Sequence, residues 1–340
     1  MDPNTVNISL QTSLDTPLPA KIAPLQLSLY NKNATTYTPF INITLPEMSV
    51  NHKTNASITN QTVHVLDHDQ LVAWFNDVFD NEMVKLSLYG KPDVSLGTLK
   101  SHPTLDKTIE LPGLNKLHGF GIKDLSLKIP PPKDGKNVQG TLNLPNWSSL
   151  TLSFGNITLS LKAAGIELGK VTVYDVNIPP GNNTRNFDGN LNLNTLISNL
   201  SKILEAEKEH LNEGNLQLNT SGIATIVNGQ HITFIEEVLN KKTLSFTISI
   251  IDLATDLLSA IVGGGDAAGS IIDIVSGVFG NSTLIGDVLG HWNGTHHNGT
   301  NALKQLAGLK KRGNNNQLGN SFLWKMMKLG LKTKRSQQRF

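Results

Sequence analysis

The stretch His64-Val65-Leu66-Asp67-His68-Asp69 gathers two histidines and two aspartates within six residues. Imidazole nitrogens and carboxylate oxygens are ligands that a hard or borderline metal ion accepts. The alternative is structural, because an aspartate just before an apolar run with helical spacing is a favoured N-cap. We favour this alternative, in which Asp67 or Asp69 caps a helix that begins at Gln70. We therefore predict no metal site and no cofactor.

Other motifs that could carry chemistry have structural explanations. The run Gly263-Gly264-Gly265-Asp266-Ala267-Ala268 resembles a dinucleotide fingerprint, but no second parallel strand follows it, so we interpret it as a hinge. Three histidines, His291, His296 and His297, lie in an Asn/Gly-rich stretch that we interpret as a solvated linker.

The sequence indicates a protein that is not an enzyme. It has no cysteine, and it contains neither a Gly-x-Ser-x-Gly elbow nor a His-Glu-x-x-His helix. A pair of hydrolytic carboxylates need not be local in sequence, so an unrecognised hydrolase stays open as an alternative.

The cellular compartment is indicated by asparagines that lie in N-glycosylation sequons. Thirteen Asn-x-Ser/Thr sequons predict N-glycosylation and hence a lumenal or extracellular protein. Their acceptors are Asn7, Asn33, Asn42, Asn55, Asn60, Asn146, Asn156, Asn182, Asn199, Asn219, Asn281, Asn293 and Asn298. The first residues do not form a signal peptide, and we expect a membrane anchor to lie outside these 340 residues.

Charge is distributed unevenly along the chain. The net charge is +2, but residues 288–340 hold ten basic and no acidic side chains, which leaves 19 basic against 27 acidic residues elsewhere. Apolar and basic residues alternate near the end as in helices that lie on anionic membrane surfaces. The expected surface contacts are Phe322, Trp324, Lys325, Lys328 and Lys332.

The basic triplet Lys310-Lys311-Arg312 is a candidate processing site, with an ordinary solvated charge cluster as the alternative. Charge alone would give only salt-sensitive, non-specific binding to nucleic acid, so we predict no nucleic-acid partner.

The elements behind these motifs are mainly β-strands. Residues 139–181 alternate apolar and polar side chains with a Gly155-Asn156 bulge, a reversal at Ala164-Gly165 and an end at Pro179-Pro180. This pattern predicts a β-meander with one buried face.

The first half of the chain repeats this order of strands and turns. Residues 25–30 correspond to 157–162, and Leu45-Pro46 corresponds to Ile178-Pro179. Each half then has an amphipathic helix, expected over 70–79 and 195–211, a returning strand at 84–89 and 215–218, and a short helical piece with a last strand at 119–129 and 242–251.

We therefore predict two tandem antiparallel β-sandwiches, each with one inserted helix. The first occupies residues 1–130 and the second 137–251, with the Pro130-Pro131-Pro132 linker between them. Residues 252–290 are expected to form an amphipathic helical segment, and 291–340 a linker with a partly disordered basic tail.

The second half of the chain resembles the late-embryogenesis-abundant type 2 domain in the order of its motifs. These are LNLPNWSSLTLSFGNITLSL, then a hairpin that ends in GIELGKVTVYDVNIPPGNN, and then a strand, a helix and a strand. The span to about Ile251 is similar to a fungal family of unknown function with tandem copies of this domain on the lumenal side of one amino-terminal membrane helix. The resemblance covers about three quarters of the chain and implies a glycosylated, membrane-tethered, non-catalytic protein of the fungal vacuole or secretory pathway.

The expected function is that of a structural or interaction protein in the fungal endomembrane lumen, associated with a membrane surface. The alternative is a binding module in which a sandwich opens between its sheets to take a lipid or another apolar ligand.

Overall fold

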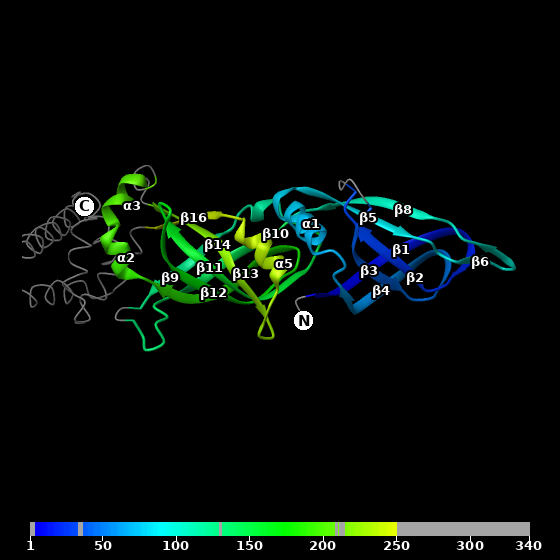
Figure 1. The fold of residues 1–340 in the computed structure, drawn as a ribbon, viewed down its shortest axis with the longest axis horizontal. Coiled ribbons are helices and arrows are strands. Elements are labelled where there is room, and N and C mark those ends of the chain that lie inside the picture. Colours follow the sequence, from blue (N-terminus) through cyan, green and yellow to red (C-terminus); the bar gives the residue numbers. More distant parts are fainter. Residues whose placement is uncertain (1–3, 33–36, 129–130, 208–209, 211–214, 250–340) are drawn as a thin grey trace, which may run out of the picture.

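A computed structural model describes residues 4–32, 37–128, 131–207, 210 and 215–249. The described chain is mainly β, as predicted, and forms two β units that lie end to end in an elongated molecule (Figure 1). No helix in these ranges is long and apolar enough to cross a membrane.

The first unit contains two four-stranded antiparallel sheets. One has the order β4-β1-β6-β7 and the other β3-β2-β5-β8. The strands of the first sheet are β1 (Thr5–Ile22), β4 (Met48–His64), β6 (Val94–Leu96) and β7 (Leu99–Ser101). Those of the second are β2 (Leu25–Tyr30), β3 (Pro39–Leu45), β5 (Met83–Gly90) and β8 (Leu105–Pro112).

The second unit is one eight-stranded sheet that curls on itself. Its order is β15-β14-β11-β12-β13-β10-β9, and β16 also pairs with β14. The curl brings β16 beside β9, where the rings of Phe120 and Phe246 lie 5.8 Å apart. The strands are β9 (Gly121–Leu127), β10 (Val138–Asn146), β11 (Leu152–Ala163), β12 (Ile166–Ile178), β13 (Gly181–Leu191), β14 (Asn215–Val227), β15 (Gln230–His231) and β16 (Leu244–Ser249).

The two units share one pattern of strand pairing. The ladders β1·β4, β2·β3, β2·β5 and β5·β8 of the first unit correspond to β10·β13, β11·β12, β11·β14 and β14·β16 of the second. The units differ between the third and fourth strands. Five residue pairs join β12 to β13, whereas in the first unit Ile41 on β3 forms an isolated bridge with Val65, the residue after β4.

The predicted β-meander is present. The register of β11 against β12 shifts on both sides of Gly155, which has a φ of +65°, so the bulge lies where the sequence placed it. Ala164 and Gly165 both have positive φ and form the tight turn between these strands. A Cβ on Gly155 would lie 2.4 Å from the Ile226 carbonyl oxygen, so glycine is required there for space as well as for conformation.

The helices occupy the ends of the units. Helix α1 (His68–Asp80) lies where the first unit meets the second, and α2 (Leu193–Ser198) and α3 (Leu200–Ala206) lie at the opposite end of the second unit (Figure 1). Where a single helix was expected over 195–211, the described residues 193–207 form two short helices. They are separated at Asn199, whose backbone leaves the helical region (φ −111°, ψ 8°).

Two short helical pieces complete the junction. The 3-10 helix η1 (Asn115–Leu117) follows β8, and α5 (Thr233–Asn240) precedes β16. Each falls just before the range expected to close its half, and both face α1.

Strand β9 departs from the expected division at residue 130. It pairs with β10 from Val138↔Leu127 to Asn143↔Gly121 and therefore belongs to the sheet of the second unit. Its alternation predicts a strand, but a local pattern does not reveal which sheet receives that strand.

The end of the proline linker is tied to the second unit. Lys136 Nζ donates to Tyr174 Oη (2.7 Å) and to Asp188 Oδ2 (3.1 Å), and Tyr174 Oη donates to Asp188 Oδ1. These hydrogen bonds raise the pKa of the Lys136 ammonium above its ordinary value. The hydrogen bonds of Lys136 thus fix the entry to β10.

Candidate functional site: an apolar cavity between the units

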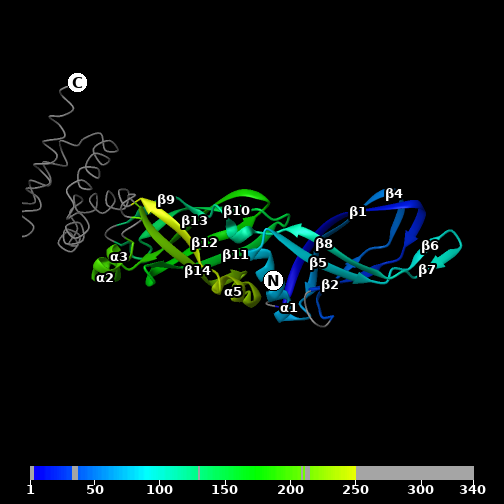
Figure 2. The ribbon, with the colours of Figure 1, turned by 90° about the horizontal axis from the view of Figure 1, so that it is seen from above.

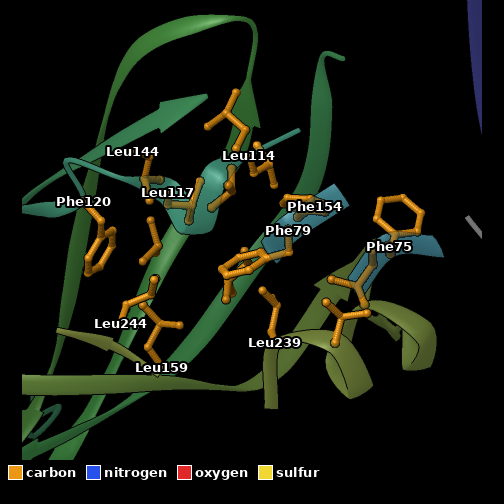
Figure 3. Close-up of a pocket in the computed structure, with 16 residues that line it drawn as sticks. Phe75, Phe79, Leu114, Leu117, Phe120, Leu144, Phe154, Leu159, Leu239 and Leu244 are labelled. Atoms are coloured by element: carbon orange, nitrogen blue, oxygen red, sulfur yellow. The ribbon is translucent and has the colours of Figure 1, made fainter. Parts of the chain in front are cut away.

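An apolar cavity lies at the end of the second unit that faces the first. Its volume is about 70 Å³. Figure 3 shows the side chains that converge on it from the sheet, from η1 and from two helices. The lining residues are all hydrophobic: Phe75, Phe79, Leu114, Leu117, Phe120, Leu144, Phe154, Ile157, Leu159, Val173, Val176, Ile178, Ile235, Val238, Leu239 and Leu244.

Helix α1 serves both units because it is apolar on two sides. Trp74 packs into the first unit, where its ring stacks on Phe40 (5.6 Å between centroids) and its Nε1 donates to the Lys85 carbonyl oxygen. Phe75 and Phe79 instead line the cavity of the second unit. Helix α1 thus contributes Trp74 to the core of the first unit and Phe75 and Phe79 to the cavity wall of the second unit.

Helix α5 forms the other half of the closure. Its buried side chains are Phe234, Ile235 and Val238, and the Phe234 ring lies 5.8 Å from that of Phe75. The contact between α1 and α5 joins residues that are about 160 positions apart in sequence.

Two polar contacts hold these helices together. Lys242 Nζ donates to Asp80 Oδ2 at 2.6 Å at the end of α1, and the Lys242 side chain is only 13% exposed. His68 Nε2 lies 2.8 Å from Glu237 Oε1 at the start of α1. We call these two pairs the straps. The helices that cover this end of the cavity are therefore held together near both ends of α1.

Burial raises the pKa of Asp77 on α1, with a further upward contribution from Asp80 and a smaller downward one from Lys242. Ionisation of the Asp77 carboxyl group in this place therefore lowers the stability of the folded protein.

The cavity suits methylene, methyl or aromatic groups. Its lining offers no hydrogen-bonding side chain that would orient a polar substrate or stabilise a charged transition state. Within the described ranges, histidines, aspartates and glutamates do not gather in groups of three that could hold a metal ion. The hydrolase alternative stays an untested prediction.

The structure assigns the His64–Asp69 cluster to capping. Asp67 Oδ1 accepts a hydrogen bond from the Gln70 backbone N–H at 2.9 Å, which confirms Asp67 as the N-cap of α1. The helix begins two residues earlier than expected, at His68. His68 contacts Glu237, whereas His64 is exposed on β4, so the two histidines serve separate roles.

The sequon asparagines differ in accessibility. The exposed ones are Asn7, Asn55, Asn60 and Asn182; the partly buried ones are Asn42, Asn156, Asn199 and Asn219. Asn146 is only 2% exposed, its Nδ2 donates to the Leu150 and Ile178 carbonyl oxygens, and its Oδ1 accepts from Ser148. A glycan on Asn146 is incompatible with this packing, so we remove Asn146 from the expected acceptors. Asn33, Asn281, Asn293 and Asn298 lie outside the described residues.

Several other predicted sites also lie outside the described residues. They are the hinge at 263–265, the histidines His291, His296 and His297, the basic triplet 310–312, and the membrane contacts Phe322, Trp324, Lys325, Lys328 and Lys332.

The sequence did not predict this cavity, and it offered binding between the sheets of a sandwich only as an alternative function. Its walls come from both units, so no single segment carries its signature. The spacing of Phe234, Ile235, Val238 and Leu239 is a helical apolar stripe that could have indicated α5, but not its partner.

Comparison with known proteins places part of this chain in context. Residues 38–161 match the model of a family described as protein of unknown function, DUF3712. The match runs from β3 to β11 and includes α1, η1 and β9, so it crosses the junction between the units. A search of curated proteins gave no match.

Proposed function

We propose that this protein is a non-enzymatic module that binds an apolar ligand, such as part of a lipid acyl chain, in the cavity between α1, α5 and the second sheet. The observation that carries this proposal is the cavity lining, in which all sixteen side chains are hydrophobic. Burial of apolar surface is the only strong source of affinity that such a site offers.

The size of the cavity dictates how a ligand would enter. Its volume of about 70 Å³ is below the roughly 300–1,000 Å³ of ordinary ligand pockets. A whole acyl chain therefore requires α1 and α5 to separate, and the straps resist that separation. We infer that ligand uptake and strap opening are coupled.

The proposed setting is the lumen of a fungal endomembrane compartment, the vacuole or the secretory pathway, next to a membrane. Exposed sequon asparagines on β1, β4 and β13 support a lumenal location, and the resemblance to tandem late-embryogenesis-abundant type 2 domains supports a membrane tether. The basic, weakly amphipathic segment near the end of the chain would add contact with the membrane surface.

A second candidate function is that of a structural or interaction protein. The end-to-end arrangement of the two units, with α1 beside α5 at their junction (Figure 2), favours it, because a joined pair of units can act as a spacer. A spacer requires no ligand, so a measurement of ligand binding distinguishes the binding module from the spacer.

The test is the binding of a dansyl-labelled fatty acid to the purified full chain. The variant Leu159→Phe places a larger side chain in the cavity, and Leu88→Phe makes the same change at a half-buried strand position of the first unit, away from the cavity. We expect saturable fluorescence enhancement in the parent and in Leu88→Phe, and at least about a tenfold loss of affinity in Leu159→Phe.

Equal binding by both variants would locate the probe elsewhere and overturn the proposal. Absence of saturable binding to the parent protein would also overturn the proposal and would favour the spacer role. Native mass spectrometry of the protein from its source would then show whether any lipid travels with it.

A further inference from the structure

The second unit shows how its curled sheet closes. Strand β9 lies along the outer edge of β10 with six residue pairs, whose register shifts once between Thr141 and Leu142, and it contacts β16 on its other side. It therefore fills the space between the two strands that would otherwise be the edges of this sheet. Strand β9 is supplied by the chain that precedes the unit.

The corresponding space in the first unit lies between β1 and β8, since these strands match β10 and β16 in the shared pairing pattern. We call this space the seam. Among the described residues, β1 pairs on its outer edge only at Lys21 and Ile22, where β6 joins it, and β8 pairs only with β5. Within the described part of the chain, no strand lies along the outer edge of β1 from Val6 to Gln11.

The inward side chains beside β9 in the second unit are more deeply buried than those beside the seam in the first unit. In the second unit Val138 and Leu142 on β10 are 2% and 3% exposed, and Phe246 on β16 is 6% exposed. In the first unit the inward side chains on the strands that flank the seam are only partly buried. They are Val6, Ile8 and Leu10 on β1 and Ile109 and Leu111 on β8.

The edge of β1 carries little of the usual protection. Residues 5–11, TVNISLQ, contain no charged side chain and no proline, two of the features with which natural proteins blunt exposed edges. The one protective feature is an irregularity between Ile8 and Leu10, where the register against β4 shifts. By contrast, the Gln61 side-chain amide covers the edge of β3, because it bonds both the N–H (3.0 Å) and the carbonyl oxygen (3.1 Å) of Thr44. Among the described residues, the first unit thus covers the edge of β3 at Thr44 and leaves the edge of β1 unpaired from Val6 to Gln11.

We propose that the seam is a docking site for an extended segment of another polypeptide, which adds a strand to β1 as β9 does to β10. The segment it fits has the character of β9 itself, whose half-buried Ile122, Leu125 and Leu127 are interspersed with the exposed Lys123, Asp124 and Ser126. Backbone hydrogen bonds to β1 supply affinity, and apolar side chains that cover Ile8, Leu10 and Ile109 supply selectivity. This inference is independent of the apolar cavity, which lies in the second unit.

The test uses a fluorescein-labelled peptide with the sequence of residues 120–128, FGIKDLSLK, and the full chain produced without glycosylation. The variant Leu10→Lys places a charge in the seam, and the matched variant Gln11→Lys places the same charge on the exposed face of the same strand. We expect saturable binding by the parent and Gln11→Lys, with at least about a tenfold loss in Leu10→Lys. The peptide variant Leu125→Lys should bind as weakly.

Hydrogen exchange identifies the place of binding. Peptide docking should slow amide exchange in residues 6–11, whereas protection confined to 138–143 would mean that the peptide replaces β9 and would overturn the proposal. Absence of saturable binding, or equal loss in Leu10→Lys and Gln11→Lys, would also overturn it. Should Leu10→Lys fail to fold by circular dichroism, Ile109→Lys on the opposite wall is used instead, with the same expected loss.

Discussion

Lys242 and Asp80 form an ion pair between the two units, with Nζ 2.6 Å from Oδ2, and the same ammonium lies 5.5 Å from the centre of the Phe79 ring. The lysine is the better buried partner, at 13% exposed against 42% for the aspartate. One side chain thus joins the end of α1 to the start of β16 and covers a ring that lines the cavity.

Replacing this lysine should weaken the junction. We expect Lys242→Met to lower the free energy of unfolding by about 1 kcal/mol, through loss of the ion pair and of the cation–π contact. The control is Lys85→Met, because Lys85 and Glu110 are 3.9 Å apart and both more than half exposed; its effect should stay within about 0.5 kcal/mol. Urea denaturation of both variants measures the difference, and equal effects would contradict a special role for Lys242.

Asp77 should make stability depend on pH. Its folded-state pKa is raised by burial and by Asp80, so the protonated form is favoured on folding and stability is lost as pH rises through the raised pKa. We expect Asp77→Asn to be more stable than the parent at neutral pH. The two proteins should converge at pH values below the usual carboxyl pKa, and thermal melts across this range check the prediction. A constant difference at all pH values would assign the effect to packing.

Gly113 should tolerate no side chain. It follows β8, and a Cβ there would lie 2.2 Å from the Asn81 carbonyl oxygen at the end of α1. We expect Gly113→Ala to cost about 2 kcal/mol by overpacking, whereas Gly121→Ala, with no atom within 4 Å and no positive φ, should change little. Thermal melts of the pair provide the comparison, and similar midpoints would refute the steric argument.

Asn146 should prove structural although it stands in a sequon. We expect Asn146→Ala to cost about 3 kcal/mol, because the Leu150 and Ile178 carbonyl oxygens lose a donor and Ser148 loses an acceptor. Asn182→Ala, at an exposed sequon, should be within about 0.5 kcal/mol of the parent. Glycopeptide mapping should find Asn146 unmodified, and a glycan at that residue would contradict the packing described here.

Much of the fold could be predicted because its signals are local. The alternation in β11 and β12, the bulge at Gly155 and the cap at Asp67 are each specified by a few neighbouring residues. The repeated pairing could be predicted too, since Leu25–Tyr30 and Ile157–Lys162 carry the same pattern.

What the sequence did not reveal is long-range. The membership of β9 in the second sheet and the meeting of Phe75 with Phe234 depend on contacts between segments that are far apart. Periodicity identifies a buried face but not the element that covers it. The candidate site consists of such contacts, and for this reason the sequence offered apolar binding only as an alternative function and did not predict where the cavity lies.

The dependence of α1 on α5 has a consequence for synthesis on the ribosome. Phe75 and Phe79 remain without their final cover until the segment from Thr233 to Lys242 has been made, because Asp80 and Lys242 are 162 residues apart. At about 5–20 residues per second, that interval lasts roughly ten to thirty seconds. During this time the nascent first unit presents an aromatic surface to its surroundings, and we expect a chaperone to occupy the surface that α5 later takes.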